Sequence, residues 1–487
     1  MKNITEGHPN FKSLEKEIFE LMCQTAREVT RQYLEWYDLR VMADRDTSEY
    51  RCVGIRATTI KTLFGEVSCR RRYYKKKDGR YIFLLDEAMG LLGNSGLVSE
   101  NLAEQIVIEC SDKSFRKAAN SISSLTGQSI SAMGAWGVAR QFGETIECQE
   151  ARLAKLAENG GEGQLGNVSS RVLFDEFDDV WLPMQKEKRQ KHNAGPSTRK
   201  KTGKKPIHIG TAYTGWIKSK DGRYNTTNKI AYASFGGTSD FAARFETLLR
   251  HCFDMDVVEH RISNADGEPW IKALATANDS ILQLDPYHRS RAIIKAVTDK
   301  SDRKSLFDAI GEKDVDKVLR VISGLCTKAK DETSREKLDK LYGYFNNNRD
   351  SFFTWQERGI KLPVPPEGVT YRNLGVQESS NCNLITQRMK HRKGSWSVTG
   401  ANHMAKILCF RSTVGLDRIL GFLPEPAAAA VPAEPLSAAK SPRYDGKGYG
   451  ADWLYAKMPF EQTFKTNGRN AIKGMLRQRT VSDLALK

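Results

Sequence analysis

The chain has 487 residues, which at roughly 100–200 residues per domain predicts two to four domains. Hydrophobic residues make up 39% of it, enough to bury a core, and no run of about 18 or more apolar residues is present that would predict a membrane span. Lysine and arginine number 76 against 59 aspartates and glutamates, and this formal charge of +17 favours a polyanionic partner, most simply nucleic acid, over a merely basic protein.

Two further features predict the compartment. The first 17 residues lack the apolar stretch of a secretory signal, so we expect the protein to stay where it is made. Its nine cysteines are scattered without a CxxC pair, which disfavours a zinc ribbon and indicates reduced thiols in a cytosol.

The N-terminal region begins with a pattern of apolar residues that predicts a helix over residues 11–45. Two β-prone runs follow, 62–74 and 81–85, and Asp78-Gly79 between them predicts a hairpin. Its basic side chains either contact phosphates or form a solvated hairpin, two alternatives that the sequence leaves equal. The candidates for DNA contact are Arg70, Arg71, Arg72, Lys75 and Lys76.

Three short helices are predicted between residues 99 and 145, over 101–110, from Ser114, and over 132–142 with Ser131 as a cap. Gly127 lies in the break between the last two. This spacing fits a helix-turn-helix, in which Arg116 and Arg140 would contact DNA, although plain helical packing gives the same pattern.

The remainder alternates between strand and helix patterns. A polar, Gly-rich linker is expected over 150–170, and a flexible basic insert over 186–205 contains Arg199, Lys200 and Lys201 as further DNA-contact candidates. Apolar spacing predicts an all-helical block over 289–361, no strand after it, and helix again over 378–420. A Pro/Ala linker over 424–442 precedes a basic tail over 443–487. Strands are predicted over 171–182, 207–216, 229–235, 257–265 and 280–284, and a helix over 241–253.

Acidic residues stand at the ends of predicted strands and at the start of a helix. Asp175, Glu176, Asp178 and Asp179 crowd one β-prone segment, which is unfavourable unless the cluster is solvent-exposed or a divalent cation neutralises it. Asp266 ends a later strand, although taken alone it reads as a turn residue.

Two further positions complete the set. Glu378 opens a helix, where the helix dipole alone would favour it. Asp285 and His288 form an Asp-x-x-His pair at a strand-to-helix junction, where a histidine is more often structural than a ligand.

The order of these features is more specific than any one of them. A strand aspartate, a second strand aspartate, Asp-x-x-His, a helical insertion and a helix-borne glutamate are the layout of an RNase H-like nuclease core. Three carboxylates that converge at one sheet edge could hold two Mg²⁺ or Mn²⁺ ions about 3.5–4 Å apart, and the lack of a Cys/His cluster argues against zinc.

Over residues 50–415 the chain resembles the bacterial insertion-sequence transposases of the ISLre type, relatives of the Mutator-like DDE transposases. The matching motifs follow in the family's order. They are Phe64-Gly65-Glu66-Val67, Arg72-Tyr73-Tyr74, Leu84-Leu85-Asp86-Glu87, Ser114-Phe115-Arg116, Asp178-Asp179-Val180-Trp181, Asp266-Gly267 with Trp270-Ile271, Asp285-x-x-His288, Glu378, Arg388-Met389, and Gly394-Ser395-Trp396-Ser397 with Gly400.

The resemblance implies a DDE transposase that cuts the ends of its own element and joins them to target DNA. Asp178, Asp266 and Glu378 fall on the family's catalytic, metal-binding residues, and Asp285 and His288 on a pair that we expect to support the core. It further implies two Mg²⁺ or Mn²⁺ ions, double-stranded DNA as element end and target, no membrane, a homo-oligomer in a synaptic complex, and a bacterial cytoplasm with nucleoid association.

Two departures leave details open. The family favours glycine after its first aspartate, where this chain has Asp179, and the nearby Asp175 competes with Asp178 for the first metal position. The alternatives are an RNase H-like nuclease without strand transfer, and a non-catalytic DNA-binding protein derived from a transposase.

The expected fold is therefore α/β, with an RNase H-like core interrupted by an all-helical insertion and preceded by a β-hairpin and a helix-turn-helix-like region. The expected segments are an N-terminal helix with hairpin (1–98), a helix-turn-helix-like region (99–150), the first part of the core (165–288), the insertion (289–361), the last part of the core (362–423), and a linker with tail (424–487).

Overall fold

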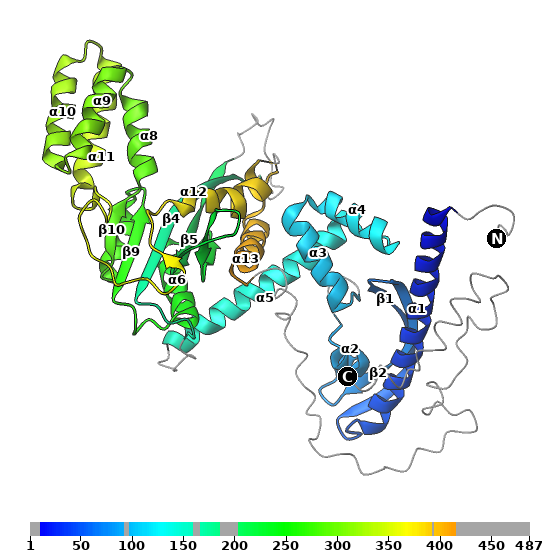
Figure 1. The fold of residues 1–487 in the computed structure, drawn as a ribbon. Coiled ribbons are helices and arrows are strands. Elements are labelled where there is room, and N and C mark those ends of the chain that lie inside the picture. Colours follow the sequence, from blue (N-terminus) through cyan, green and yellow to red (C-terminus); the bar gives the residue numbers. More distant parts are fainter. Residues whose placement is uncertain (1–9, 92–96, 159–165, 186–202, 392–393, 415–487) are drawn as a thin grey trace, which may run out of the picture. The chain divides into compact units, whose positions relative to one another are not determined.

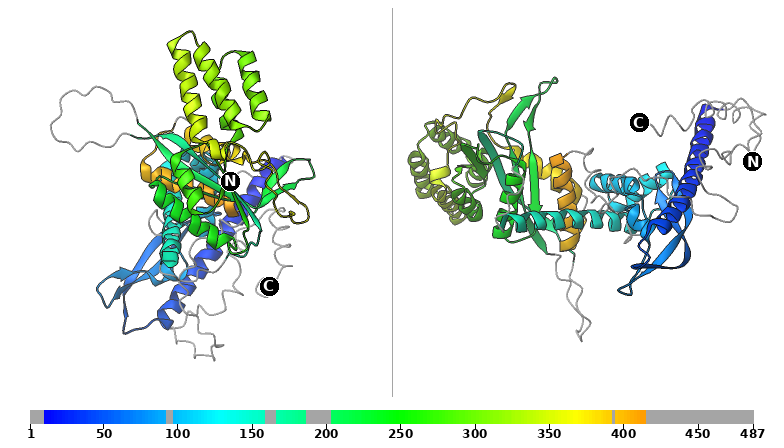
Figure 2. Two further views of the ribbon diagram at one scale, coloured as in Figure 1. Left: turned by 90° about the vertical axis from the view of Figure 1, so that its left-hand side faces the viewer. Right: turned by 90° about the horizontal axis from the view of Figure 1, so that it is seen from below.

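The computed structural model describes residues 10–91, 97–158, 166–185, 203–391 and 394–414 (Figure 1). The chain divides into two compact units. The first comprises Met1–Cys110, Phe115–Val138 and Leu420–Lys487, and the second comprises Ser111–Ser114 and Ala139–Ile419. Helices and mixed sheets occur together, so the fold is mixed α/β, as expected (Figure 2).

The first unit is built on a long helix and an antiparallel hairpin. Helix α1 (Phe11–Asp44) confirms the predicted helix. It packs along strand β2 (Gly65–Lys76), which pairs with β1 (Tyr50–Thr62). Glu35 and Asp38 of α1 accept hydrogen bonds from the backbone N–H groups of Arg70 (3.3 Å) and Arg72 (3.1 Å). The helix thereby covers a strand edge whose peptide groups would otherwise be unpaired.

The hairpin differs from its prediction in two places. The run 62–74 is not one strand, because the chain turns at Leu63-Phe64 and Gly65 adopts a φ of +120°, which other residues rarely tolerate. The predicted turn at Asp78-Gly79 is confirmed, but only Tyr81–Ile82 (β3) pairs beyond it. Leu84–Ala88 forms helix α2 instead of continuing the strand.

The three predicted helices after residue 99 are present as α3 (Glu100–Asp112), α4 (Phe115–Thr126) and α5 (Ala132–Glu158). Ser131 caps α5 as expected, since its Oγ accepts the N–H of Gly134 at 2.9 Å. Helix α5 is much longer than the predicted 132–142. It fills the first part of the expected linker, of which residues 159–165 lie outside the described ranges.

The second unit is organised around a five-stranded sheet in the order β10-β9-β4-β5-β8. On one side of β4, β9 pairs parallel to β4 and β10 pairs parallel to β9. On the other side, β5 pairs antiparallel to β4 and β8 pairs antiparallel to β5. All five lie where strands were predicted. Their bounds are Val172–Pro183 (β4), Lys204–Tyr213 (β5), Ile230–Ser234 (β8), His260–Ala265 (β9) and Ile281–Leu284 (β10).

The first six residues of strand β4 are buried, so side chains on both of its faces pack against other elements. On one face Leu173 and Phe177 pack against helices α6 (Thr238–Cys252) and α7 (Pro269–Ala277). On the other face Val172 and Phe174 pack with Tyr213 and Trp216. Helix α13 (Val398–Val414) lies along the edge strand β8, where Thr413 Oγ1 accepts the N–H of Ala231 at 3.0 Å.

A second, three-stranded sheet contradicts the prediction that no strand follows the helical block. Strand β11 (Val369–Thr370) pairs with β6 (Gly215–Lys218), which also pairs with β7 (Tyr224–Thr227). Strand β11 spans two residues, too few for an alternating pattern to be visible in the sequence.

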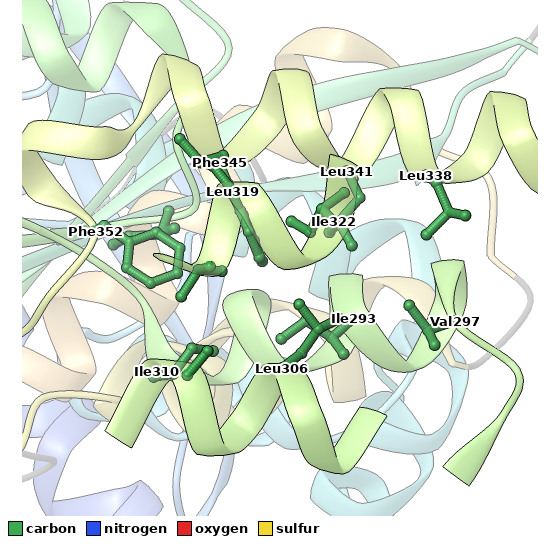
Figure 3. Close-up of a cluster of buried hydrophobic side chains, with 13 residues drawn as sticks. Ile293, Val297, Leu306, Ile310, Leu319, Ile322, Leu338, Leu341, Phe345 and Phe352 are labelled. Carbon is green, nitrogen blue, oxygen red and sulfur yellow. The ribbon is translucent and has the colours of Figure 1, made fainter. Parts of the chain in front are cut away.

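The predicted all-helical block is present and begins at the end of β10. Aspartates 285, 299, 314 and 331 cap its four helices, which surround a buried cluster that includes Ile293, Leu306, Ile322 and Phe345 (Figure 3). We call this block the helical insertion. Its helices are α8 (Pro286–Ala296), α9 (Lys300–Gly311), α10 (Val315–Lys328) and α11 (Glu332–Asn347), and a 3₁₀ turn (Arg349–Ser351) ends the helical structure ten residues before the predicted boundary.

The last part of the described chain is helical, as predicted for 378–420. It comprises α12 (Val376–Asn381), a π-helix (Cys382–Lys390) and α13. The expected Pro/Ala linker and basic tail, like residues 186–202 of the basic insert, lie outside the described ranges. None of the helices in the described part of the chain combines the length and apolar character needed to cross a bilayer.

Phe345 tests whether the helical insertion is held by its core. We expect Phe345→Ala to destabilise it by about 3–5 kcal/mol, because the ring is fully buried against Phe352 and its loss leaves a cavity. Hydrogen exchange of peptides from α8 to α11 measures this local stability. Tyr342→Ala is the control, since Tyr342 lies on the same helix but is 38% exposed; equal loss of protection in both variants would contradict the packing.

Candidate functional site

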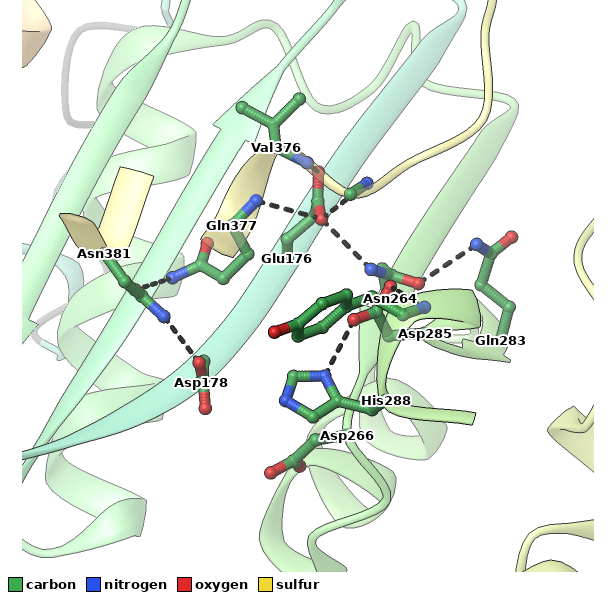
Figure 4. Close-up of polar contacts among 12 residues, drawn as sticks. Glu176, Asp178, Asn264, Asp266, Gln283, Asp285, His288, Val376, Gln377 and Asn381 are labelled. Atoms are coloured by element: carbon green, nitrogen blue, oxygen red, sulfur yellow. Dashed lines mark hydrogen bonds and ion pairs between the residues drawn. The ribbon is translucent and has the colours of Figure 1, made fainter. Parts of the chain in front are cut away.

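A row of buried polar side chains crosses the three parallel strands. Glu176 on β4 is level with Asn264 on β9, which is level with Gln283 on β10. Asn264 Nδ2 donates to Glu176 Oε2 and Gln283 Nε2 donates to Asn264 Oδ1, both at 3.0 Å (Figure 4). The row fixes the register of the strands immediately before the positions of the predicted acidic residues.

The next level of the same register contains the predicted aspartates. Continuing the β4–β9 pairing by two residues brings Asp178 level with Asp266, and continuing β10 by one brings Asp285 level with Asp266. Asp266 lies in a tight turn in which Gly267 adopts a φ of +99°. Tyr344 of the helical insertion donates its hydroxyl to the Asp266 carbonyl oxygen at 2.6 Å, so the insertion helps to hold this turn.

Asp178, His288 and Glu378 offer ligand atoms that all lie within 4.8 Å of one another. This geometry differs in one point from the sequence-based assignment, because His288, expected only to support the core, belongs to the closest group, and Asp266 does not. Asp266 is nevertheless near enough for its charge to act on both Asp178 and His288 (Figure 4). Two carboxylates and one imidazole suit Mn²⁺ or Mg²⁺, with the nitrogen favouring Mn²⁺.

The pKa values reflect crowded negative charge. Burial, together with the carboxylates of Asp266 and Glu378, raises the pKa of Asp178 to about 6, although the Asp179 N–H (2.7 Å) and His288 oppose the rise. Burial also raises the pKa of Asp266. A bound cation would relieve this crowding, because it stabilises the charged form of each carboxylate.

Asp285 orients His288. Its Oδ2 lies 2.7 Å from His288 Nδ1, and this hydrogen bond, with the negative charge, raises the pKa of His288. Burial opposes ionisation of Asp285, but its bond to His288 outweighs burial and lowers its pKa. With Nδ1 engaged, the other ring nitrogen is the one available to a ligand, as in many carboxylate–histidine–metal pairs. The predicted supporting role of Asp285 therefore has a geometric basis.

The two other aspartates of the acidic strand have partners elsewhere. Asp175 is fully buried and accepts from Arg261 Nε at 2.6 Å, and Arg261 also binds Glu246 of α6. Asp179 binds His208 Nδ1 at 2.6 Å. Because side chains alternate along a strand, both lie on the face opposite Asp178. Of the two candidates for the first metal position, only Asp178 lies with Glu378 and His288.

Glu176 is the residue that sequence reasoning missed. Its buried carboxylate accepts from Tyr213 Oη (2.5 Å), Asn264 Nδ2, and the backbone N–H groups of Gly375, Val376 (3.0 Å each) and Gln377 (3.3 Å). These N–H groups open α12, the helix that carries Glu378. A buried charge with five donors is strongly stabilised, and here it attaches the glutamate helix to the aspartate strand.

Asn381, one turn beyond Glu378, forms a second connection. Its Nδ2 donates to Asp178 Oδ2 at 2.5 Å, and its Oδ1 accepts from Gln377 Nε2 at 2.8 Å. Gln377 Oε1 in turn accepts the hydroxyl of Thr211 on β5 at 2.7 Å. One orientation of α12 therefore satisfies the hydrogen bonds to both β4 and β5.

The basic residues predicted to contact DNA fall into two classes. Arg71 pairs with Asp86 (2.7 Å) and lies over the Phe83 ring, and Arg72 pairs with Asp38 (2.5 Å), so both stabilise the first unit instead of facing solvent. Lys76 pairs with Glu49 at 3.1 Å. Exposed positions are held by Arg70, Lys75, Arg116 and Arg140, while Arg199, Lys200 and Lys201 lie outside the described ranges.

Glu176→Gln tests whether Glu176 positions Glu378. The amide has one acceptor oxygen for five donors, so we expect a loss of about 1–3 kcal/mol in stability and roughly tenfold weaker Mn²⁺ binding. Isothermal titration of the full-length protein with Mn²⁺ and thermal unfolding measure the two effects.

Glu246→Gln is the matched control, because it disturbs a partly buried carboxylate on the opposite face of the same sheet. It should lower stability while leaving Mn²⁺ affinity unchanged. If both variants weaken Mn²⁺ binding equally, Glu176 acts only through general stability.

The comparisons with known proteins agree on one family. The model of the uncharacterised protein family UPF0236 matches residues 4–420. A UPF0236 protein of Caldanaerobacter subterraneus subsp. tengcongensis, whose name joins eleven loci, is 25% identical over 424 residues, 85% of this chain and 80% of its own length. A UPF0236 protein of Streptococcus gallolyticus, named for the region 3′ of vanSb, is 24% identical over 412 residues, 83% of this chain and 84% of its own. The chain therefore belongs to the UPF0236 family.

Proposed function

We propose that this protein is a DDE transposase of an insertion sequence, of the ISLre type, that cleaves and joins DNA with divalent metal ions. The observation that carries the proposal is the convergence of Asp178, His288 and Glu378, separated by up to 200 residues, within 4.8 Å. Asp266 lies at the same register level. Such a cluster, next to the C-terminal ends of the parallel strands β9 and β10, suits catalysis at phosphate.

The sheet topology supports an RNase H-like core. Three antiparallel neighbours (β8, β5, β4) followed by two parallel strands (β9, β10) match that fold, with α12 bringing the final glutamate to the first strand. The helical insertion lies between β10 and α12, where the resemblance to DDE transposases leads us to expect one.

In this proposal the chain's residues arrange the reacting groups. Asp178, Glu378 and Asp266 would hold the cations, and His288, oriented by Asp285, would complete the ligand set. Bound cations would activate the attacking oxygen and stabilise the leaving oxygen. Water would form a bond to phosphorus at the element end while the bond to the 3′ oxygen breaks, and that oxygen would leave as a 3′-hydroxyl. The freed 3′-hydroxyl would then attack a target phosphate in line and displace the 3′ oxygen of the target strand, which takes up the proton.

The rest of the chain is consistent with a DNA partner. The charge of +17 favours a nucleic-acid partner, which we propose is double-stranded DNA, and α3–α5 with Arg116 and Arg140 would form a helix-turn-helix-like reader. The name of one relative joins eleven loci of a single organism, and several copies in one genome are expected of a gene that copies itself. We further propose a homo-oligomer in the synaptic complex, acting at the bacterial nucleoid.

The carboxylates provide the direct test. We expect Asp178→Asn, Asp266→Asn and Glu378→Gln each to abolish Mg²⁺-dependent nicking of element-end DNA, a loss of at least about a hundredfold, because each removes a negative ligand. Binding to the same DNA in the absence of metal should be nearly intact. A nicking assay on supercoiled plasmid and a band-shift assay measure the two.

Asp179→Asn is the matched control for this series. It changes the same residue type at the next position of β4, but Asp179 binds His208 on the opposite face. It should retain nicking within about tenfold of wild type. Full activity of any of the three site variants would remove that residue from the catalytic site.

Strand transfer separates the proposal from its alternatives. With a pre-cleaved end bearing a 3′-hydroxyl, a transposase yields joined product, whereas an RNase H-like nuclease yields hydrolysis alone. A non-catalytic DNA-binding protein yields neither, and metal-dependent nicking would exclude it. Inverted repeats bounded by short direct repeats in the DNA flanking the gene would independently favour the transposase.

A further inference from the structure

Helix α8 begins inside the candidate site and leads away from it. Asp285 is its N-cap and His288 lies in its first turn. The buried side of α8 packs on the other helices of the helical insertion, where Ile293 is fully buried. Arg289 binds Glu357 at 2.9 Å and also the Phe352 carbonyl. The exposed side is therefore held in one orientation relative to the site.

That exposed side carries an aromatic ring and two cations. Tyr287 is 47% exposed, and its ring packs edge-on against that of His288 with 5.4 Å between centroids. The Arg291 guanidinium lies 5.8 Å from the Tyr287 centroid, and Lys295 is exposed one turn farther along. At 1.5 Å per residue the three follow one another at steps of about 6 Å. We call these three residues the α8 stripe.

The cations of the stripe are unlike several others of the helical insertion. Lys317, Arg320 and Arg349 pair with Glu312, Asp314 and Asp316. Within the described part of the chain, neither Arg291 nor Lys295 has an acidic partner. Both remain available to an external anion next to a site that we propose acts on phosphodiesters.

We propose that the α8 stripe binds a single-stranded nucleic-acid segment adjoining the scissile phosphate. The inference rests on the proposed function for the location of that phosphate. Arg291 and Lys295 would contact successive phosphates, and a base would stack on Tyr287. A single strand fits better than a duplex, because only an unpaired base can offer its face to the ring.

The test measures binding of a fluorescein-labelled 12-nucleotide single strand to the full chain by anisotropy, in EDTA, over a range of salt concentrations. We expect Arg291→Ala with Lys295→Ala to reduce the slope of log Kd against log salt by about 1.4, since each phosphate contact on a single strand contributes about 0.7. Tyr287→Ala should weaken binding about tenfold, and Tyr287→Phe should leave it unchanged.

The matched control is Lys317→Ala with Arg320→Ala, which removes the same charge from the same helical insertion but from existing ion pairs. It should leave the slope within about 0.3 of the wild-type value. An equal fall of the slope in both double variants, or no fall with the α8 pair, would overturn the inference. Arg291→Gln with Lys295→Gln repeats the measurement if the alanine pair lowers the unfolding temperature.

Because binding is measured without metal, its outcome is independent of catalysis. Stripe-dependent binding without any Mg²⁺-dependent nicking would contradict the proposed function and leave the α8 surface intact. If the protein nicks DNA but its single-strand binding does not depend on the α8 stripe, the proposed function would stand and the α8 inference would be wrong.

Discussion

The candidate site depends on one buried carboxylate. Glu176 has no exposed surface, yet it accepts hydrogen bonds from two side chains and from three peptide groups that open α12. Burial raises its pKa, and the five donors are what make a charge at this position tolerable. Without that interaction α12 would be held to the sheet by fewer hydrogen bonds, such as those of Asn381 with Asp178 and of Gln377 with Thr211, and the position of Glu378 relative to Asp178 would be less firmly fixed.

The strands and the site constrain one another. The level of Glu176, Asn264 and Gln283 is fully hydrogen-bonded, with Gln283 Oε1 accepting the N–H of Trp355 at 3.1 Å. A shift of β9 by one residue would break this row and turn every side chain to the other face. The same shift would move Asp266 away from Asp178. Correct pairing of the buried row therefore also aligns the acidic residues beyond it.

Sequence patterns predicted much of this arrangement, and their failures have physical causes. The helical insertion was predictable because its helices bury apolar residues at helical spacing, and the five sheet strands were predictable as short β-prone runs. The sequence did not decide between Asp175 and Asp178 for the first metal position, because it does not show which face of a strand contacts a helix far along the chain. The role of Glu176 could not be predicted, because its partners are mostly backbone N–H groups some 200 residues away. The ion pairs of Arg71 and Arg72 could not be predicted, because their partners Asp86 and Asp38 lie on other elements.

The negative charge of the candidate site would make binding of a phosphodiester depend on bound cations. Asp178, Asp266, Asp285 and Glu378 gather four carboxyl groups around His288, and a phosphodiester brought to them would meet strong repulsion. Divalent cations would reverse the local sign and make the same cluster attractive to phosphate. In the proposal above, Arg291 and Lys295 of α8, which lie beyond the cluster, would hold a nucleic acid that the unfilled cluster repels. Under the proposed function, binding of nucleic acid to the carboxylate cluster would require metal, whereas binding to the α8 stripe would not.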